Sequence, residues 1–132
     1  MKIFVVAFIT VCVSFSAVAM STFDAYMYRL ADENAVLKIQ LCDLTADSKT
    51  SEQHADCRLK PQSDVKARYL TAAKALKKPA QKLAFKNYYA VVLTQIKAVD
   101  VISGETVRGY DNRQRDAKTR ADEAWIGFEV EL

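Results

Sequence analysis

From Ser21 onwards, apolar side chains recur along the chain at helical spacing. Over residues 21–44 the intervals between them alternate between four and three, which is a seven-residue repeat with one polar member. Its members are Phe23, Met27, Leu30, Asn34, Leu37, Leu41 and Leu44. The repeat predicts a helix capped by Ser21 or Thr22 that buries this stripe in a packed seam, with Asn34 setting the register.

Three further helices follow from the same kind of pattern. The second is expected after Pro61, with Ser63 as its N-cap, and a break is expected at Pro79. The third covers about residues 80–102 and is apolar over a wide arc, and one long helix kinked at Pro79 is the alternative. Gly104 ends it, and the fourth helix runs towards the C-terminus.

These four stripes predict an all-α fold, a small antiparallel four-helix bundle. The composition agrees, because the chain has only three Gly and two Pro, whereas an all-β domain of this size needs many turn residues. The bundle is expected to occupy residues 20–132 as a single domain.

Residues 1–19 have the three parts of a signal peptide. Lys2 supplies the positive charge, residues 3–13 form the apolar core, and residues 17–19 (Ala-Val-Ala) form a cleavage site. We expect cleavage after residue 19 and a periplasmic or secreted location. An uncleaved membrane anchor is the alternative, since the uncharged stretch continues to Phe23.

Cleavage would remove Cys12 and leave two cysteines, Cys42 and Cys57. An even number of cysteines in an oxidising compartment predicts a disulfide, here closing a polar loop of about 15 residues and contributing on the order of 3 kcal/mol. A zinc site that also used His54 and Asp56 would fit no common ligand spacing, so no metal is expected.

Charge is strongly segregated along the chain. Residues 58–98 carry a net charge of +9, between a segment of −4 (residues 20–57) and one of −3 (residues 99–132). In one interpretation the basic segment packs between two acidic ones inside the fold. In the other it forms a basic face for an acidic partner. Nucleic acid is not expected as that partner, because an exported chain with a near-neutral total charge does not suit it.

Lysines concentrate on both sides of the predicted break at Pro79. A tight bend there would gather them at one end of the bundle, with one of the consecutive residues Tyr88 and Tyr89 facing outwards. The candidate partner-binding residues are therefore Lys74, Lys77, Lys78, Lys82, Lys86 and Tyr89.

Recognisable catalytic chemistry is sparse. The single histidine, His54, lies in the polar loop, and there is no Gly-rich phosphate loop or haem-attachment motif, so no cofactor is expected. The adjacent acidic pairs 32–33 and 122–123 point about 100° apart on their helices and are interpreted as solvated. We therefore expect a non-enzymatic protein that binds a protein with an acidic surface, as an inhibitor, an immunity-like factor or a chaperone. The alternative is binding of anionic lipid or cell-wall polymer through the basic segment; the oligomeric state stays open.

Overall fold

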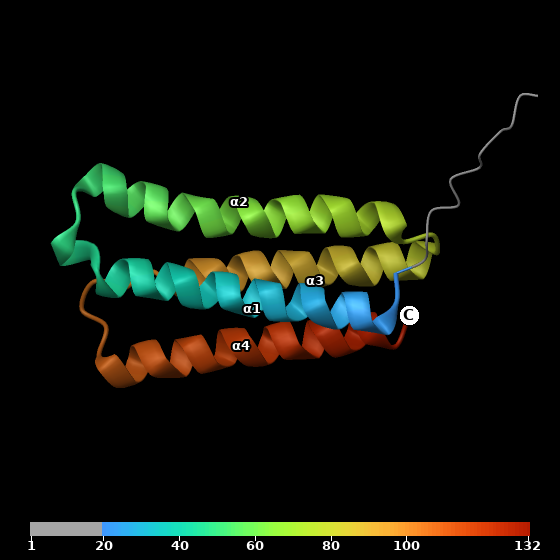
Figure 1. The fold of residues 1–132 in the computed structure, drawn as a ribbon. Coiled ribbons are helices and arrows are strands. Elements are labelled where there is room, and N and C mark those ends of the chain that lie inside the picture. The colour runs from blue at the N-terminus through green and yellow to red at the C-terminus, as the bar shows by residue number, and fades with distance from the viewer. Residues whose placement is uncertain (1–19) are drawn as a thin grey trace, which may run out of the picture.

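Within residues 20–132, which the computed structural model describes, four helices form a bundle in which each helix runs antiparallel to the one that follows it in the chain (Figure 1). They are α1 (Thr22–Leu44), α2 (Ser51–Ala75), α3 (Pro79–Ala98) and α4 (Val107–Glu129), with a short 3-10 turn, η1 (Ala46–Ser48), after α1. This confirms the predicted all-α bundle. The predicted signal peptide lies outside the described residues. Among the described helices, none has the length and hydropathy needed to cross a membrane.

The helix starts are fixed by side-chain caps. Ser21 accepts a hydrogen bond from the amide of Asp24 at 3.0 Å, and Thr50 accepts one from the amide of Gln53 at 3.2 Å, each in a reciprocal capping box. The second box starts α2 at Ser51, well before the predicted cap at Ser63, so that expectation was wrong. Pro61 instead lies inside α2, where it is buried and lacks only one backbone donor.

The other predicted boundaries are closer to those observed. Pro79 begins α3, in agreement with the break predicted there. Gly104 has a positive φ of 79°, which fits its predicted place after the end of a helix. However, α3 ends at Ala98 instead of about residue 102, and Tyr110 and Arg113 of α4 then bond to backbone carbonyls of the following connection.

The structure corrects which face of α1 is buried. The residues that face the bundle are Ala25, Arg29, Asp32, Ala35, Val36, Ile39 and Cys42. The seven residues of the predicted seam lie on the opposite face, and the six apolar ones are 39–80% exposed. We call this set, Phe23, Met27, Leu30, Asn34, Leu37, Leu41 and Leu44, the outer stripe.

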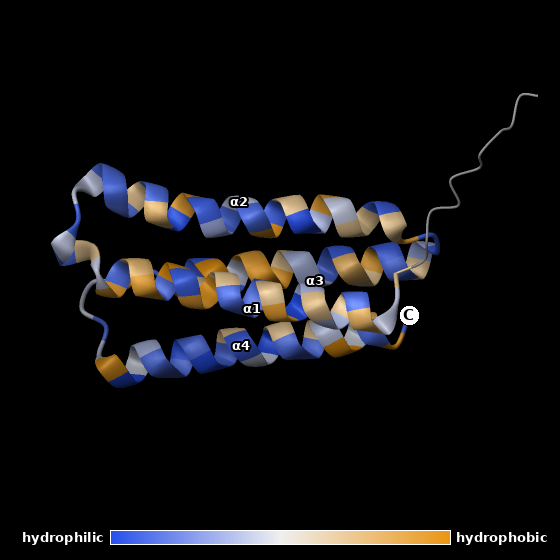
Figure 2. Cartoon of the chain, viewed as in Figure 1, coloured by the Kyte–Doolittle hydropathy of each residue, from blue (hydrophilic) through white to orange (hydrophobic). Residues whose placement is uncertain are grey.

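The core lies between the inner faces of all four helices. Phe85 of α3 packs against Phe128 of α4, and Tyr88 packs against Trp125; Val92 belongs to the same core cluster. α3 packs mainly on α4, and α1 mainly on α2. Hydrophobic residues are frequent along α1 and α3, whereas α2 and α4 are largely hydrophilic (Figure 2).

Candidate functional site

The predicted disulfide is present and joins the last turn of α1 to α2. Cys42 and Cys57 are bonded, with their Cα atoms 5.8 Å apart. Beside them the carboxylate of Asp43 accepts hydrogen bonds from Arg58 at 2.6 Å and contacts the His54 ring at 2.8 Å. The disulfide and these polar contacts link α1 to α2. No cluster of potential metal ligands is found in the described residues.

The lysines predicted to bind a partner are all exposed. Lys74 lies in the last turn of α2, Lys77 and Lys78 lie in the α2–α3 connection, and Lys82 and Lys86 lie on the first turns of α3. We call these five the lysine end. It lies at the end of the bundle where α1 begins and α4 finishes (Figure 1). In residues 20–132, no carboxylate lies within ion-pair distance of any of the five.

Tyr89 differs from these lysines. Its ring stacks on that of Tyr69, with the ring centroids 4.0 Å apart, and the residue is half-buried. Tyr88 is the member of the pair that faces the core, and it is 1% exposed. The structure therefore gives Tyr89 a packing contact with α2, and the residue remains partly exposed.

The basic segment forms ion pairs within the fold through its arginines. Arg58 pairs with Asp43 and Asp100, and Arg68 pairs with Asp32 at 3.0 Å, so the arginines bind the acidic segments within the fold. The lysine end has no such partners. The internal charge complement is thus made by arginines, and the lysines stay available on the surface.

A buried polar network connects α1 to the other three helices. Asp32 accepts hydrogen bonds from the hydroxyl of Tyr88 at 2.7 Å and from Arg68 at 3.0 Å. Arg29 lies over the Tyr88 ring and donates to Asp122. Burial raises the pKa of the Asp32 carboxyl, although its donors oppose that shift.

This network corrects the expectation that Asp32 lies on a solvated face, since it is 7% exposed. A sequence signal for it existed. Ala25, Arg29, Asp32, Val36 and Ile39 also follow intervals of four and three, which is a second seven-residue repeat on the opposite face of α1. Both oxygens of Asp32 are hydrogen-bonded inside the protein, so the network can fix the rotation of α1 about its axis.

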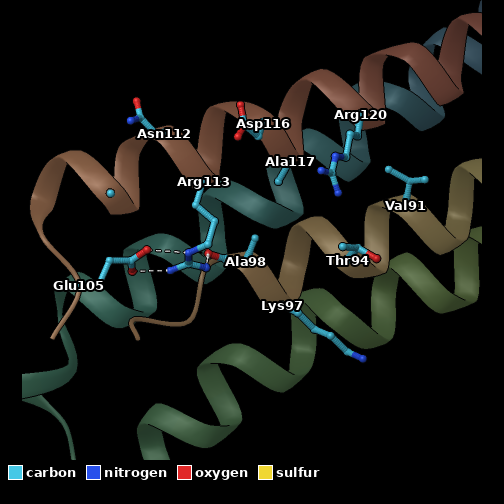
Figure 3. A pocket seen from close by; sticks show the side chains of 11 residues that line it. Val91, Thr94, Lys97, Ala98, Glu105, Asn112, Arg113, Asp116, Ala117 and Arg120 are labelled. Carbon is cyan, nitrogen blue, oxygen red and sulfur yellow. Dashed lines mark hydrogen bonds and ion pairs between the residues drawn. The ribbon is translucent and has the colours of Figure 1, made fainter. Parts of the chain in front are cut away.

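A second polar cluster lies in the groove between α3 and α4 (Figure 3). There the guanidinium of Arg113 donates to Glu105 at 2.7 and 2.8 Å, and to the carbonyls of Ala98 and Asp100. The hydrogen bond from Arg113 lowers the pKa of Glu105. Because the guanidinium of Arg113 donates to carbonyls at the end of α3 while it pairs with Glu105, these contacts hold the α3–α4 connection.

The outer stripe is a row of large exposed apolar side chains on one helix. It follows the whole length of α1, with the exposed Tyr26 beside it. If a large apolar residue has on the order of 200 Å² of surface, the exposed fractions leave roughly 700 Å² of the stripe accessible to solvent. Soluble monomers rarely expose a contiguous apolar patch above a few hundred Å², and such patches mark sites of interaction.

Comparison with known proteins adds no homologue to this description. No protein-family model matches the chain, and neither a curated protein nor a solved structure shows significant similarity to it. Function is therefore inferred from the surfaces described above.

Proposed function

We propose that this chain is a non-enzymatic helical domain that acts by binding another protein, and that the outer stripe of α1 is the surface it uses. The supporting observation is the exposure of six large apolar side chains in a single row along one helix. From Phe23 to Leu44 the row is about 30 Å long at 1.5 Å per residue. Anchors at such intervals are the means by which a helix binds a groove or another helix.

The lysine end is a separate surface for a partner. It lies on α2 and α3, at the end of the bundle where α1 begins. Acidic groups of a partner would complement its unpaired lysines, whichever protein covers the outer stripe. Inhibitor, immunity-like and chaperone-like roles all use a docking surface of this kind.

Photo-cross-linking from single positions tests this proposal. A benzophenone amino acid would replace Leu37 in the outer stripe or Leu59 on α2, two leucines of similar exposure (57% and 61%). In cells that express the full-length chain, we expect a discrete protein adduct from position 37 and none from position 59. An absence of adducts at position 37, or the same adducts from both positions, would contradict the proposal.

A second candidate function rests on the unpaired lysines. Five exposed lysines with no nearby carboxylate provide a surface for anionic lipid or cell-wall polymer. Flotation with phosphatidylglycerol vesicles should then fall steeply as salt is raised, and should be lost in a Lys78→Glu/Lys82→Glu variant. Lys60→Glu/Lys66→Glu, which changes two exposed lysines of α2 away from that end, is the control. Equal loss in both variants would reject the lysine end as the site.

A further inference from the structure

We infer that the protein bound at the outer stripe is a second copy of this chain, paired with the first through α1 in parallel orientation. The inference rests on the proposed function, because it names the partner of the same surface. It is carried by the spacing of the outer stripe, by its single polar member and by the charges at its edges.

The spacing is that of a helix made to pair with a like helix. In heptad terms, Met27, Asn34 and Leu41 occupy position a, and Phe23, Leu30, Leu37 and Leu44 occupy position d. In a parallel, in-register pair, each residue lies opposite the same residue of the second copy, so Asn34 faces Asn34. The amide side chain has both a donor and an acceptor, so two copies can hydrogen-bond to each other. One Asn in an apolar seam is a known means of fixing register and orientation.

The charged edges favour the same orientation. Glu33 and Lys38 occupy positions g and e, five residues apart, which is the separation that places them together across a parallel pair. Twofold symmetry makes this contact twice. In an antiparallel pair, g positions instead lie across the seam from g positions. The two Glu33 side chains, which carry the same charge, would then approach each other.

Both groups can make this contact. Lys38 is exposed and has no carboxylate within 4.0 Å among residues 20–132. Glu33 contacts Arg29 at 3.3 Å and Lys118 at 3.8 Å, both through Oε1, and its side chain remains 35% exposed. Its second carboxylate oxygen is therefore left to accept a hydrogen bond from Lys38 of the second copy.

The exposed area is also sufficient. The outer stripe offers roughly 700 Å² of apolar residue surface per chain. Specific interfaces bury about 800 Å² per partner, and the polar edges of α1 supply the remainder. Two copies thus cover each other's exposed leucines with no contribution from another protein.

Sedimentation equilibrium tests the pairing directly. The chain, expressed at full length and purified with its Cys42–Cys57 bond intact, should sediment as a dimer at micromolar concentration. A Leu37→Lys/Leu41→Lys variant should raise the dissociation constant at least about 100-fold, because four charges then enter the seam. The control is Leu59→Lys/Leu70→Lys on α2, where the leucines are equally exposed but lie off the stripe. A wild-type monomer at every concentration, or equal dissociation of the control, overturns the inference.

Cysteine cross-linking tests the orientation. Asn34→Cys and Met27→Cys should each form a symmetric cross-linked dimer under mild oxidation, with peptide mapping to show that the native disulfide remains. In an antiparallel pair centred on Asn34, only Asn34→Cys would cross-link, because the two copies of residue 27 would lie about 21 Å apart along the axis. That result would refute the parallel arrangement.

The two proposals fail in different ways. If the chain is monomeric but position 37 cross-links to a different polypeptide, the second-copy inference is wrong and the docking function stands. If position 37 gives no protein adduct and the chain is monomeric, both are wrong. A position-37 adduct of twice the chain mass that contains only this chain supports both.

Discussion

The burial of α1 can be tested by shortening two side chains that lie two residues apart. Ile39 is fully buried and Leu37 is 57% exposed, although hydrophobicity alone would rank them as equals. Truncation of a buried Ile to Ala costs about 2–5 kcal/mol, since it removes transfer free energy and leaves a cavity. Full burial of a Leu is worth about 1.5–3 kcal/mol, so the smaller buried part of Leu37 implies a loss of about 1 kcal/mol or less.

Urea unfolding is the appropriate assay, with the disulfide intact and the protein dilute enough to be monomeric. With an m-value of about 1–1.5 kcal/mol/M, Ile39→Ala should lower the urea midpoint by about 1.3–5 M, and Leu37→Ala by about 1 M or less. Leu59→Ala, at 61% exposure, is the matched control and should behave like Leu37→Ala.

The reverse result would refute the reasoning. If Leu37→Ala in the monomer costs as much as Ile39→Ala, the outer stripe is packed inside the bundle. If Leu37→Ala lowers the stability only at high protein concentration, Leu37 contributes through the contact between two copies. Only that contact depends on protein concentration.

Three further results are expected. Reduction of the Cys42–Cys57 bond, which closes a 15-residue separation, should destabilise the fold by about 3 kcal/mol, and an unchanged urea midpoint under reductant would contradict this. Tyr88→Phe should cost about 1–3 kcal/mol in urea unfolding, since it removes a donor to buried Asp32, whereas a neutral effect would show that the network contributes little. Burial raises the pKa of Asp122, but hydrogen bonds from Lys118 and Arg29 lower it more, so the net shift is downward. The ionised carboxylate therefore stabilises the folded state. The thermal midpoint of Asp122→Asn should therefore fall below wild type at pH 7 and converge with it below about pH 4, and a constant difference would refute this.

Local sequence signals predicted the bundle because they are the signals that determine helices. The scarcity of turn residues, Pro79 at a helix start, and Gly104 at a positive φ all act through the backbone of their own segment. The cysteine pairing was predictable for a similar reason, since only two cysteines remain in the described domain. The start of α2 was missed because Pro61 was weighted above the capping box at Thr50.

The rotation of α1 was not predictable from the same signals. Two seven-residue repeats run along this helix, and the outer one has the larger apolar side chains. The inner repeat contains Arg29 and Asp32, whose burial depends on Tyr88, Arg68 and Asp122, between 36 and 93 residues further along the chain. No periodicity measured within α1 includes those partners.

The lysines that were predicted to bind a partner illustrate the opposite case. Lysine side chains are almost always exposed in folded proteins, so the surface position of these lysines was predictable from the sequence. Tyr89 was harder, because its stacking on Tyr69 depends on the packing of α2 against α3. The sequence pattern identified the residues of the outer stripe but predicted that they are buried. The structure leaves them exposed, which makes them a candidate docking surface.

Why α1 keeps its more apolar face outward follows from what a rotation would cost. Turning the helix to bury the outer stripe would gain less than about 1.5–3 kcal/mol for each Leu, because these side chains are already partly buried, and it would expose Val36 and Ile39 in exchange. The same rotation would leave the charges of Arg29 and Asp32 without Tyr88, Arg68 and Asp122, and breaking a buried ion pair costs about 3–5 kcal/mol. It would also carry Cys42 away from its bonded partner on α2. Polar contacts and the disulfide together hold α1 in one orientation, and an apolar row that the bundle does not cover is left available for a second protein.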